Sequence, residues 1–137
     1  MTSDLDRLNR RFAAVLKNVR EMLPPAVLKG ANEVADMQRR LAPVDEGDLR
    51  DSITVTPPGG TTPPYSQPGG SRTAGELEAI VTAGNSNVRY PHHVEHGTSK
   101  MKARPFFFPG WRFARRRSLD RIRRYGRKAV RTGWNNP

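Results

Sequence analysis

The chain has 137 residues, with 24 Lys and Arg against 13 Asp and Glu, and a net charge of +11. It contains no Cys, which excludes a disulfide framework and a thiolate metal site. No apolar run approaches the ~20 residues of a membrane span, and the amino terminus has no signal-peptide core. We therefore expect a single domain, residues 1–137, that is made and kept in a cytoplasm.

The positive charge is concentrated near the carboxyl terminus. Residues 1–56 carry nine basic and nine acidic side chains, and residues 57–110 carry five and three. Residues 111–137 carry ten basic side chains and one acidic side chain. A basic tail, rather than a uniformly basic protein, is the feature that a function must explain.

The amino-terminal part of the chain predicts two helices. Apolar side chains recur at spacings of three and four through residues 1–24, which indicates an amphipathic helix. Pro24 and Pro25 are expected to end or kink it. A second helix is expected over residues 25–42, because Pro43 disfavours a helical conformation in the residue before it.

A β-hairpin with a long connection is expected next. Residues 45–48 read as a turn, and residues 52–56 are a β-branched strand. Residues 76–83 supply the antiparallel partner strand. The Pro- and Gly-rich residues 57–75 between them are expected to form a long surface loop or a partly disordered arm, which could become ordered on contact with a partner.

The remaining elements complete an α+β domain. After a turn at residues 84–87, a short strand is expected at 88–90 and another at 104–108. A long basic helix follows over residues 109–132. The predicted fold is a small, mostly antiparallel sheet with a long hairpin loop, packed against the amino-terminal helices and the basic helix.

The segment from Tyr90 to Pro109 carries the clearest signal for an interface. It combines a sharp turn at Gly97 with three consecutive phenylalanines. Strand alternation would turn Phe106 and Phe108 inward and Phe107 outward, and an exposed ring marks an interface. The predicted subunit interface consists of Val94, Glu95, Gly97, Thr98, Met101, Pro105, Phe106, Phe107 and Phe108.

The basic helix has two interpretations. Its apolar stripe is expected to pack on the sheet, and its cations either form a solvated face or bind an acidic partner. The stripe consists of Trp111, Ala114, Leu119, Ile122, Tyr125 and Ala129. Ten cations around one Asp repel one another, which favours an acidic protein surface or a phosphate backbone. The residues predicted to bind that partner are Arg112, Arg115, Arg116, Arg121, Arg124, Arg127, Lys128 and Arg131.

Catalytic and metal chemistry find little support. His92 and His96 could share a helix face, but Pro91 and Gly97 leave barely one turn between them. The order of residues also differs from the H-E-x-x-H metal motif. Residues 45–51 are acidic but lack the order of a calcium loop. We expect no catalytic residue, no metal ion and no cofactor.

Three blocks of sequence occur in a recognisable order. They are L-A-P-V-D-E-G-D-L-R-D-S-I, then I-V-T-A-G-N-S with V-E-H-G-T-S-K-M, and A-R-P-F-F-F-P before the basic helix. Their order and spacing resemble the neck and tail-completion proteins of long-tailed bacteriophages.

The resemblance implies a structural virion protein without enzymatic activity. Such a protein would form a homohexameric ring at the head–tail junction, complete the tail and join it to the head. The implied partners are copies of itself, adjoining connector, stopper and tail-tube proteins, and genomic DNA in the channel. It would assemble in the host cytoplasm and act in the virion, with no membrane partner.

Two alternatives remain open from the residues alone. The basic helix could make the chain a nucleic-acid-binding protein without sequence preference, because no base-reading motif accompanies it. A metal-dependent nuclease that uses the histidines is a third possibility.

Overall fold

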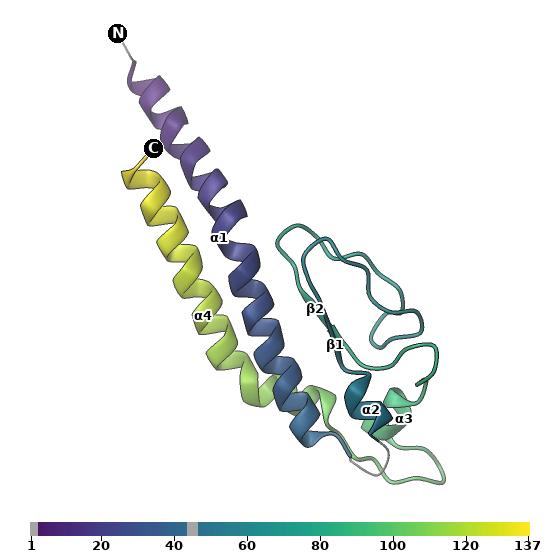
Figure 1. The fold of residues 1–137 in the computed structure, drawn as a ribbon. Helices are drawn as coiled ribbons and strands as arrows, with labels where there is room; N and C mark the ends of the chain where they lie inside the picture. Colours follow the sequence, from purple (N-terminus) through teal and green to yellow (C-terminus); the bar gives the residue numbers. More distant parts are fainter. Residues whose placement is uncertain (1–2, 44–46) are drawn as a thin grey trace.

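The structure is a computed structural model that describes residues 3–43 and 47–137. It confirms the α+β class. The elements are α1 (Asp4–Leu41), α2 (Asp48–Asp51), β1 (Thr54–Thr56), β2 (Ile80–Thr82), α3 (Pro91–His96) and α4 (Phe107–Asn135). In Figure 1 the long helices α1 and α4 form an antiparallel hairpin that projects past a lobe built from the other elements. Asp45 and Glu46, part of the predicted turn, lie outside the described residues.

Helix α1 is a single helix of 38 residues, so the predicted break at Pro24 and Pro25 is wrong. Ser3 and Asp6 form a capping box that starts the helix. The two prolines remove two backbone donors, at a cost of about 3 kcal/mol each. The helix nevertheless continues, because α4 packs along it on both sides of the prolines and tertiary packing dominates helix stability.

Small residues bring α1 and α4 into close contact. A Cβ atom added to Gly133 would lie 2.6 Å from the Cα of Val15, and one added to Gly110 would lie 2.8 Å from the Cα of Gln38. The two contacts are at opposite ends of the hairpin. The helices therefore run antiparallel and come into backbone contact near both ends of the hairpin. The buried residues of α4 are Gly110, Ala114, Ser118, Ala129 and Gly133.

This packing corrects the predicted role of the apolar stripe on the basic helix. The stripe was expected to face the sheet, but α4 packs on α1. Trp111 and Tyr125, two members of the predicted stripe, are exposed. Within the part of the chain that the structure describes, no helix is both long and apolar enough to cross a membrane.

Polar side chains connect the two long helices at three levels. Asn18 Nδ2 donates to the carbonyl of Ala129 over 3.4 Å, and Gln38 Nε2 donates to the carbonyl of Phe107 over 2.8 Å. Between them, Glu33 accepts a hydrogen bond from Ser118 Oγ and forms an ion pair with Arg121. These contacts fix the register of α4 along α1.

The sheet consists of β1 and β2, paired antiparallel with Val55 opposite Val81. The predicted hairpin is confirmed, with shorter strands. Phe106 is fully buried at the centre of the lobe, in a cluster that also contains Ala35, Ala42, Leu49, Ile53, Ala83, Val88 and Val94.

Two predicted strands are absent from the described residues. Residues 88–90 follow a turn closed by Asn85 and Val88, whose backbones bond to each other at 2.9 and 3.2 Å, and they form no ladder. Residues 104–108 do not form a strand either, because α4 begins at Phe107. The basic helix therefore starts two residues earlier than predicted and ends later, at Asn135.

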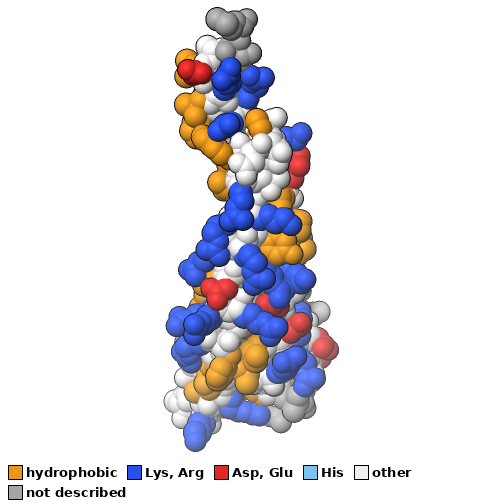
Figure 2. Space-filling view, turned by 90° about the vertical axis from the view of Figure 1, so that its left-hand side faces the viewer, with side chains coloured by type: hydrophobic (Ala, Val, Ile, Leu, Met, Phe, Trp, Pro, Cys, Tyr) orange, Lys and Arg blue, Asp and Glu red, His pale blue; other side chains and the backbone are white. Residues whose placement is uncertain are grey.

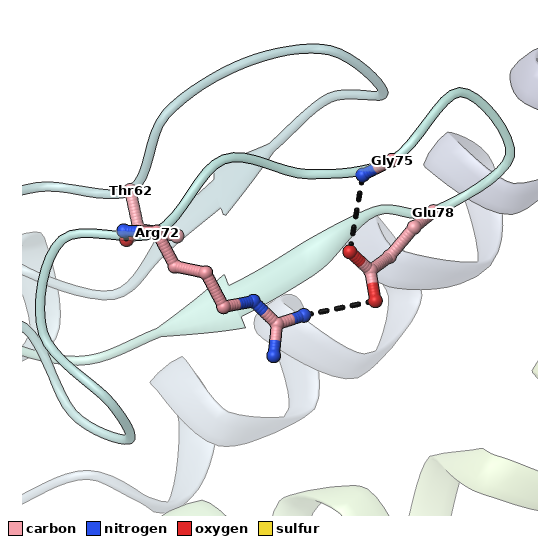
Figure 3. A network of polar contacts seen from close by, with 4 residues as sticks. All are labelled: Thr62, Arg72, Gly75 and Glu78. Atoms are coloured by element: carbon pink, nitrogen blue, oxygen red, sulfur yellow. Dashed lines mark hydrogen bonds and ion pairs between the residues drawn. The ribbon is translucent and has the colours of Figure 1, made fainter.

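The long loop, residues 57–75, is folded back rather than left as an unpaired arm. Thr61 pairs with Thr73, and Gln67 near the tip pairs with Ala83 beside β2. Figure 3 shows the network that closes its base: Glu78 accepts from the backbone N–H of Gly75 at 3.1 Å and from Arg72 Nη2 at 2.8 Å. The hydrogen bond from Gly75 holds the pKa of Glu78 below its ordinary value of 4.5, and Arg72 lowers that pKa further.

Candidate assembly surfaces

The predicted turn at Gly97 is confirmed. Gly97 ends α3 with a φ of 77°, and its N–H donates to the carbonyl of His93 over 2.7 Å. A Cβ atom at this position would lie 2.8 Å from the backbone nitrogen of Ala103. Glycine is thus required both by the positive φ and by the close return of the chain.

A buried carboxylate joins this turn to the aromatic segment. Glu95 Oε2 accepts from the backbone N–H groups of Phe106 and Phe107 at 2.8 and 2.9 Å, and Oε1 accepts from that of Phe108 at 3.1 Å. These N–H groups have no partner within α4. Glu95 therefore caps α4 from the neighbouring helix α3, and its negative charge lies at the positive end of the α4 dipole.

This cap changes which phenylalanine is exposed. The segment enters a helix, so strand alternation does not apply. Phe106 is fully buried, Phe107 is half-buried against the core cluster, and Phe108 is 47% exposed. The predicted inward orientation of Phe108 and outward orientation of Phe107 are wrong. Among the nine predicted interface residues, those with exposed side chains are Thr98, Met101, Pro105 and Phe108.

Phe108 lies at the rim of an apolar groove between the two long helices and β2. The groove is lined by Val34 and Ile122 from the helices and by Val81 from the sheet. Trp111, one turn after Phe108, also lines it and is exposed. The first turns of α4 thus present two aromatic rings beside an apolar depression. Neither feature is needed to bury the core of a single chain.

The cations of α4 lie mostly in solvent. Arg121 pairs with Glu33, and Arg123 pairs with Asp120 at 3.6 Å. Among the described residues, no acidic side chain lies within 4.0 Å of the other eight. Figure 2 shows Lys and Arg side chains spread along this face over most of the molecule, with few Asp and Glu. The predicted basic surface is thus exposed and largely unneutralised.

The histidine cluster forms part of the lobe surface. The rings of His92 and His96 lie tilted against each other with centroids 4.7 Å apart, and the ring of His96 lies 6.3 Å from that of Phe108. In the described residues no group of three or more His, Cys, Asp or Glu side chains could hold a metal ion.

One further surface was not predicted from the sequence. The first turns of α1 extend past the end of α4, and Figure 2 shows hydrophobic side chains along one edge of this upper part. Leu5 and Leu8 are exposed there. No local pattern in the sequence indicates this overhang, because it depends on a contact between residues far apart in the chain. Gly133 lies against Val15, which places the end of α4 level with about the tenth residue of α1.

Comparison with known families decides the broad class. A family model described as "Bacteriophage HK97-gp10, putative tail-component" matches residues 6–97. The chain belongs to this HK97-gp10-like family. The match covers α1, the sheet and α3, and it ends at the Gly97 turn. Searches of curated proteins and of solved structures found no match.

Family membership identifies a structural component of a phage tail. It confirms the coarse part of the resemblance: a virion protein of the tail that works with other tail or head proteins. In this HK97-gp10-like protein, the matched residues 6–97 include α1, on which α4 packs. The exposed Phe108 and Trp111 and the basic face of α4 lie after the matched region in the chain.

Proposed function

We propose that this protein forms a ring at the head-proximal end of the phage tail, where it completes the tail and joins it to the head. Membership in a tail-component family supports the location. The turn at residues 94–101 and the aromatic segment 105–108 would contribute to the contact between subunits. A homohexamer would match the symmetry implied by the resemblance to neck proteins.

The observation that carries the proposal is the exposure of Phe108 and Trp111 beside the apolar groove. Apolar side chains next to an uncovered depression mark a protein interface. Burial of one such ring contributes roughly 1.5–3 kcal/mol. If the aromatic side chains of one subunit cover a different surface of the next subunit, the contact is head-to-tail, and such contacts form a ring when the rotation between subunits closes.

A pair of variants tests ring formation. Phe108→Asp should leave the far-ultraviolet circular dichroism of the protein native-like and abolish its self-association, measured by light scattering or native mass spectrometry. Phe113→Asp is the matched control, because Phe113 is 70% exposed on the same helix but does not line the groove. Full assembly of Phe108→Asp would remove the proposed interface.

The exposed cations of α4 favour one alternative to ring formation, which is binding of DNA without sequence preference. Arginine and lysine side chains would then contact only the phosphates. Its affinity would then fall steeply with salt, with a slope of about −0.9 per phosphate neutralised. A monomer that binds duplex DNA with a slope of about −5 would support this function. An assembled ring with weak DNA affinity would support the first.

The folded-back loop, residues 57–75, would contact an adjoining ring of subunits through its exposed side. Its own backbone pairing already fixes its shape. Its docking would thus require little ordering of the chain, unlike that of the unpaired arm expected from the sequence.

A further inference from the structure

The outer face of α4 has a shallow hollow near the end of the helical hairpin. We call it the arm hollow, because it lies on the arm that α1 and α4 form beyond the lobe, away from the loop of residues 57–75. Its apolar residues are Val130 and Trp134. Arg123, Arg127 and Arg131 line it as well. The hollow thus combines an apolar surface with cationic side chains.

The apolar residues of the arm hollow are exposed, and the indole of Trp134 is held by neighbouring side chains. Val130 is 47% exposed and Trp134 is 36% exposed. The ring of Phe12 packs edge-on against the indole at 5.8 Å, and the Arg11 guanidinium lies 5.0 Å from its centroid. A held aromatic ring beside arginines has the composition of an interface hot spot, where Trp and Arg are enriched.

Charge determines which partner fits. The hairpin segment that contains the hollow, residues 4–23 and 123–135, carries ten Lys and Arg and three Asp and Glu, a net charge of +7. A second copy of this segment would bring the same positive charge to the contact. Arginine guanidinium groups instead bind carboxylates in a planar, bidentate geometry.

The apolar residues of the arm hollow favour a protein partner over nucleic acid. A phosphate backbone could neutralise Arg127 and Arg131, but it offers no apolar group to cover Val130 and Trp134. The overhanging turns of α1 add Leu5 and Leu8, which are also exposed, to the apolar surface nearby. A segment that carries both apolar and acidic side chains satisfies both requirements.

We infer that the arm hollow docks an acidic segment of another virion protein, with an apolar side chain over Val130 and Trp134 and carboxylates against Arg127 and Arg131. This inference names a partner chemistry for the proposed function. It rests on that function for the docking of the protein to other virion components, and it does not depend on the groove beside Phe108.

Site-specific photocrosslinking in assembled particles tests the partner. With Val130→p-benzoylphenylalanine, irradiation should link this chain to a different virion protein. Mass spectrometry should place the link in a segment where Asp or Glu flanks an apolar residue. A link to a second copy of the chain or to DNA would overturn the inference, as would the absence of any link in particles that contain the variant.

Charge reversal tests the arginines. Arg127→Glu combined with Arg131→Glu should lower the number of copies per particle by about tenfold or more, because like charges would face the partner. Lys29→Glu with Arg117→Glu is the matched control, with the same charge change on exposed residues of the two long helices that do not line the hollow. Equal incorporation of both double variants would contradict the inference.

The same variants separate this inference from ring formation. Both double variants should assemble normally as purified protein, whereas Phe108→Asp should not. Loss of incorporation by the Arg127 and Arg131 variant despite a normal ring supports the arm hollow as a docking site. A normal ring with normal incorporation rejects the arm hollow and leaves the proposed ring intact.

Discussion

The carboxylate of Glu95 accepts a hydrogen bond of 2.8 Å from the backbone N–H of Phe106, the fully buried residue at the centre of the lobe. This contact joins the two parts of the molecule. Glu95 belongs to α3 in the lobe, and Phe106 is the N-cap of α4 in the hairpin. The first turn of the long basic helix is thus held by a side chain of the lobe.

Replacement of Glu95 should therefore destabilise the whole protein. Glu95→Ala leaves three backbone donors without their acceptor, and we expect the free energy of unfolding to fall by about 3 kcal/mol or more. Glu95→Gln keeps one acceptor oxygen and should cost less. Urea denaturation followed by circular dichroism measures both.

Glu76→Ala is the control, because Glu76 is exposed and its 3.7 Å contact with Arg20 lies at the surface. A Glu95→Ala variant as stable as this control would contradict the capping role.

The glycines of α4 should differ sharply in their tolerance of alanine. Gly133→Ala would place a methyl group 2.6 Å from the backbone of Val15, so the helices must separate, and we expect a loss of about 2 kcal/mol. Gly126→Ala meets only the end of Leu23 at 3.9 Å and should stabilise the protein by about 0.5–1 kcal/mol through helix propensity. Thermal unfolding of the two variants makes the comparison, and the opposite order would show that the helices are not in backbone contact.

The prolines within α1 offer a test of helix continuity. Pro25 is exposed in an uninterrupted helix, so Pro25→Ala should restore a backbone hydrogen bond to the carbonyl of Glu21. We expect a gain of about 1–3 kcal/mol in the free energy of unfolding, together with a small increase in helical circular dichroism. If α1 were two helices joined at this point, the substitution would lower stability or leave it unchanged.

The base of the long loop should respond to acid. The pKa of Glu78 is lowered in the folded protein, first by the N–H of Gly75 and then by Arg72. The ionised carboxylate therefore stabilises the closed loop when the pH is above 4.5, the ordinary pKa of a Glu side chain. This contribution is lost as the pH falls through the lower pKa that Glu78 has in the folded protein. NMR titration of the Glu78 carboxyl should show a midpoint below 4.5. Arg72→Gln should raise this midpoint without restoring the ordinary value, since the bond from Gly75 remains. A midpoint at or above 4.5 in the native chain would exclude the network.

Local patterns in the sequence determined much of the architecture. Spacings of three and four along residues 5–23 and 111–131 predicted helices, and β-branched runs before and after the long loop predicted the hairpin. Gly97 predicted the turn that the structure contains. Each of these signals is carried by residues close together in the chain, so propensity and periodicity are sufficient to read them.

Contacts between distant residues decided the rest. Pro24 and Pro25 stay within a helix because α4, about a hundred residues later in the chain, packs beside them. Phe108 points to solvent because Glu95 starts a helix where alternation predicted a strand. The arm hollow and the overhang of α1 depend on where α4 ends along α1, which the packing of Gly110 and Gly133 against α1 fixes. Burial and capping across the fold outweigh local preference by several kcal/mol, so only the tertiary structure could reveal which surfaces remain open to partners.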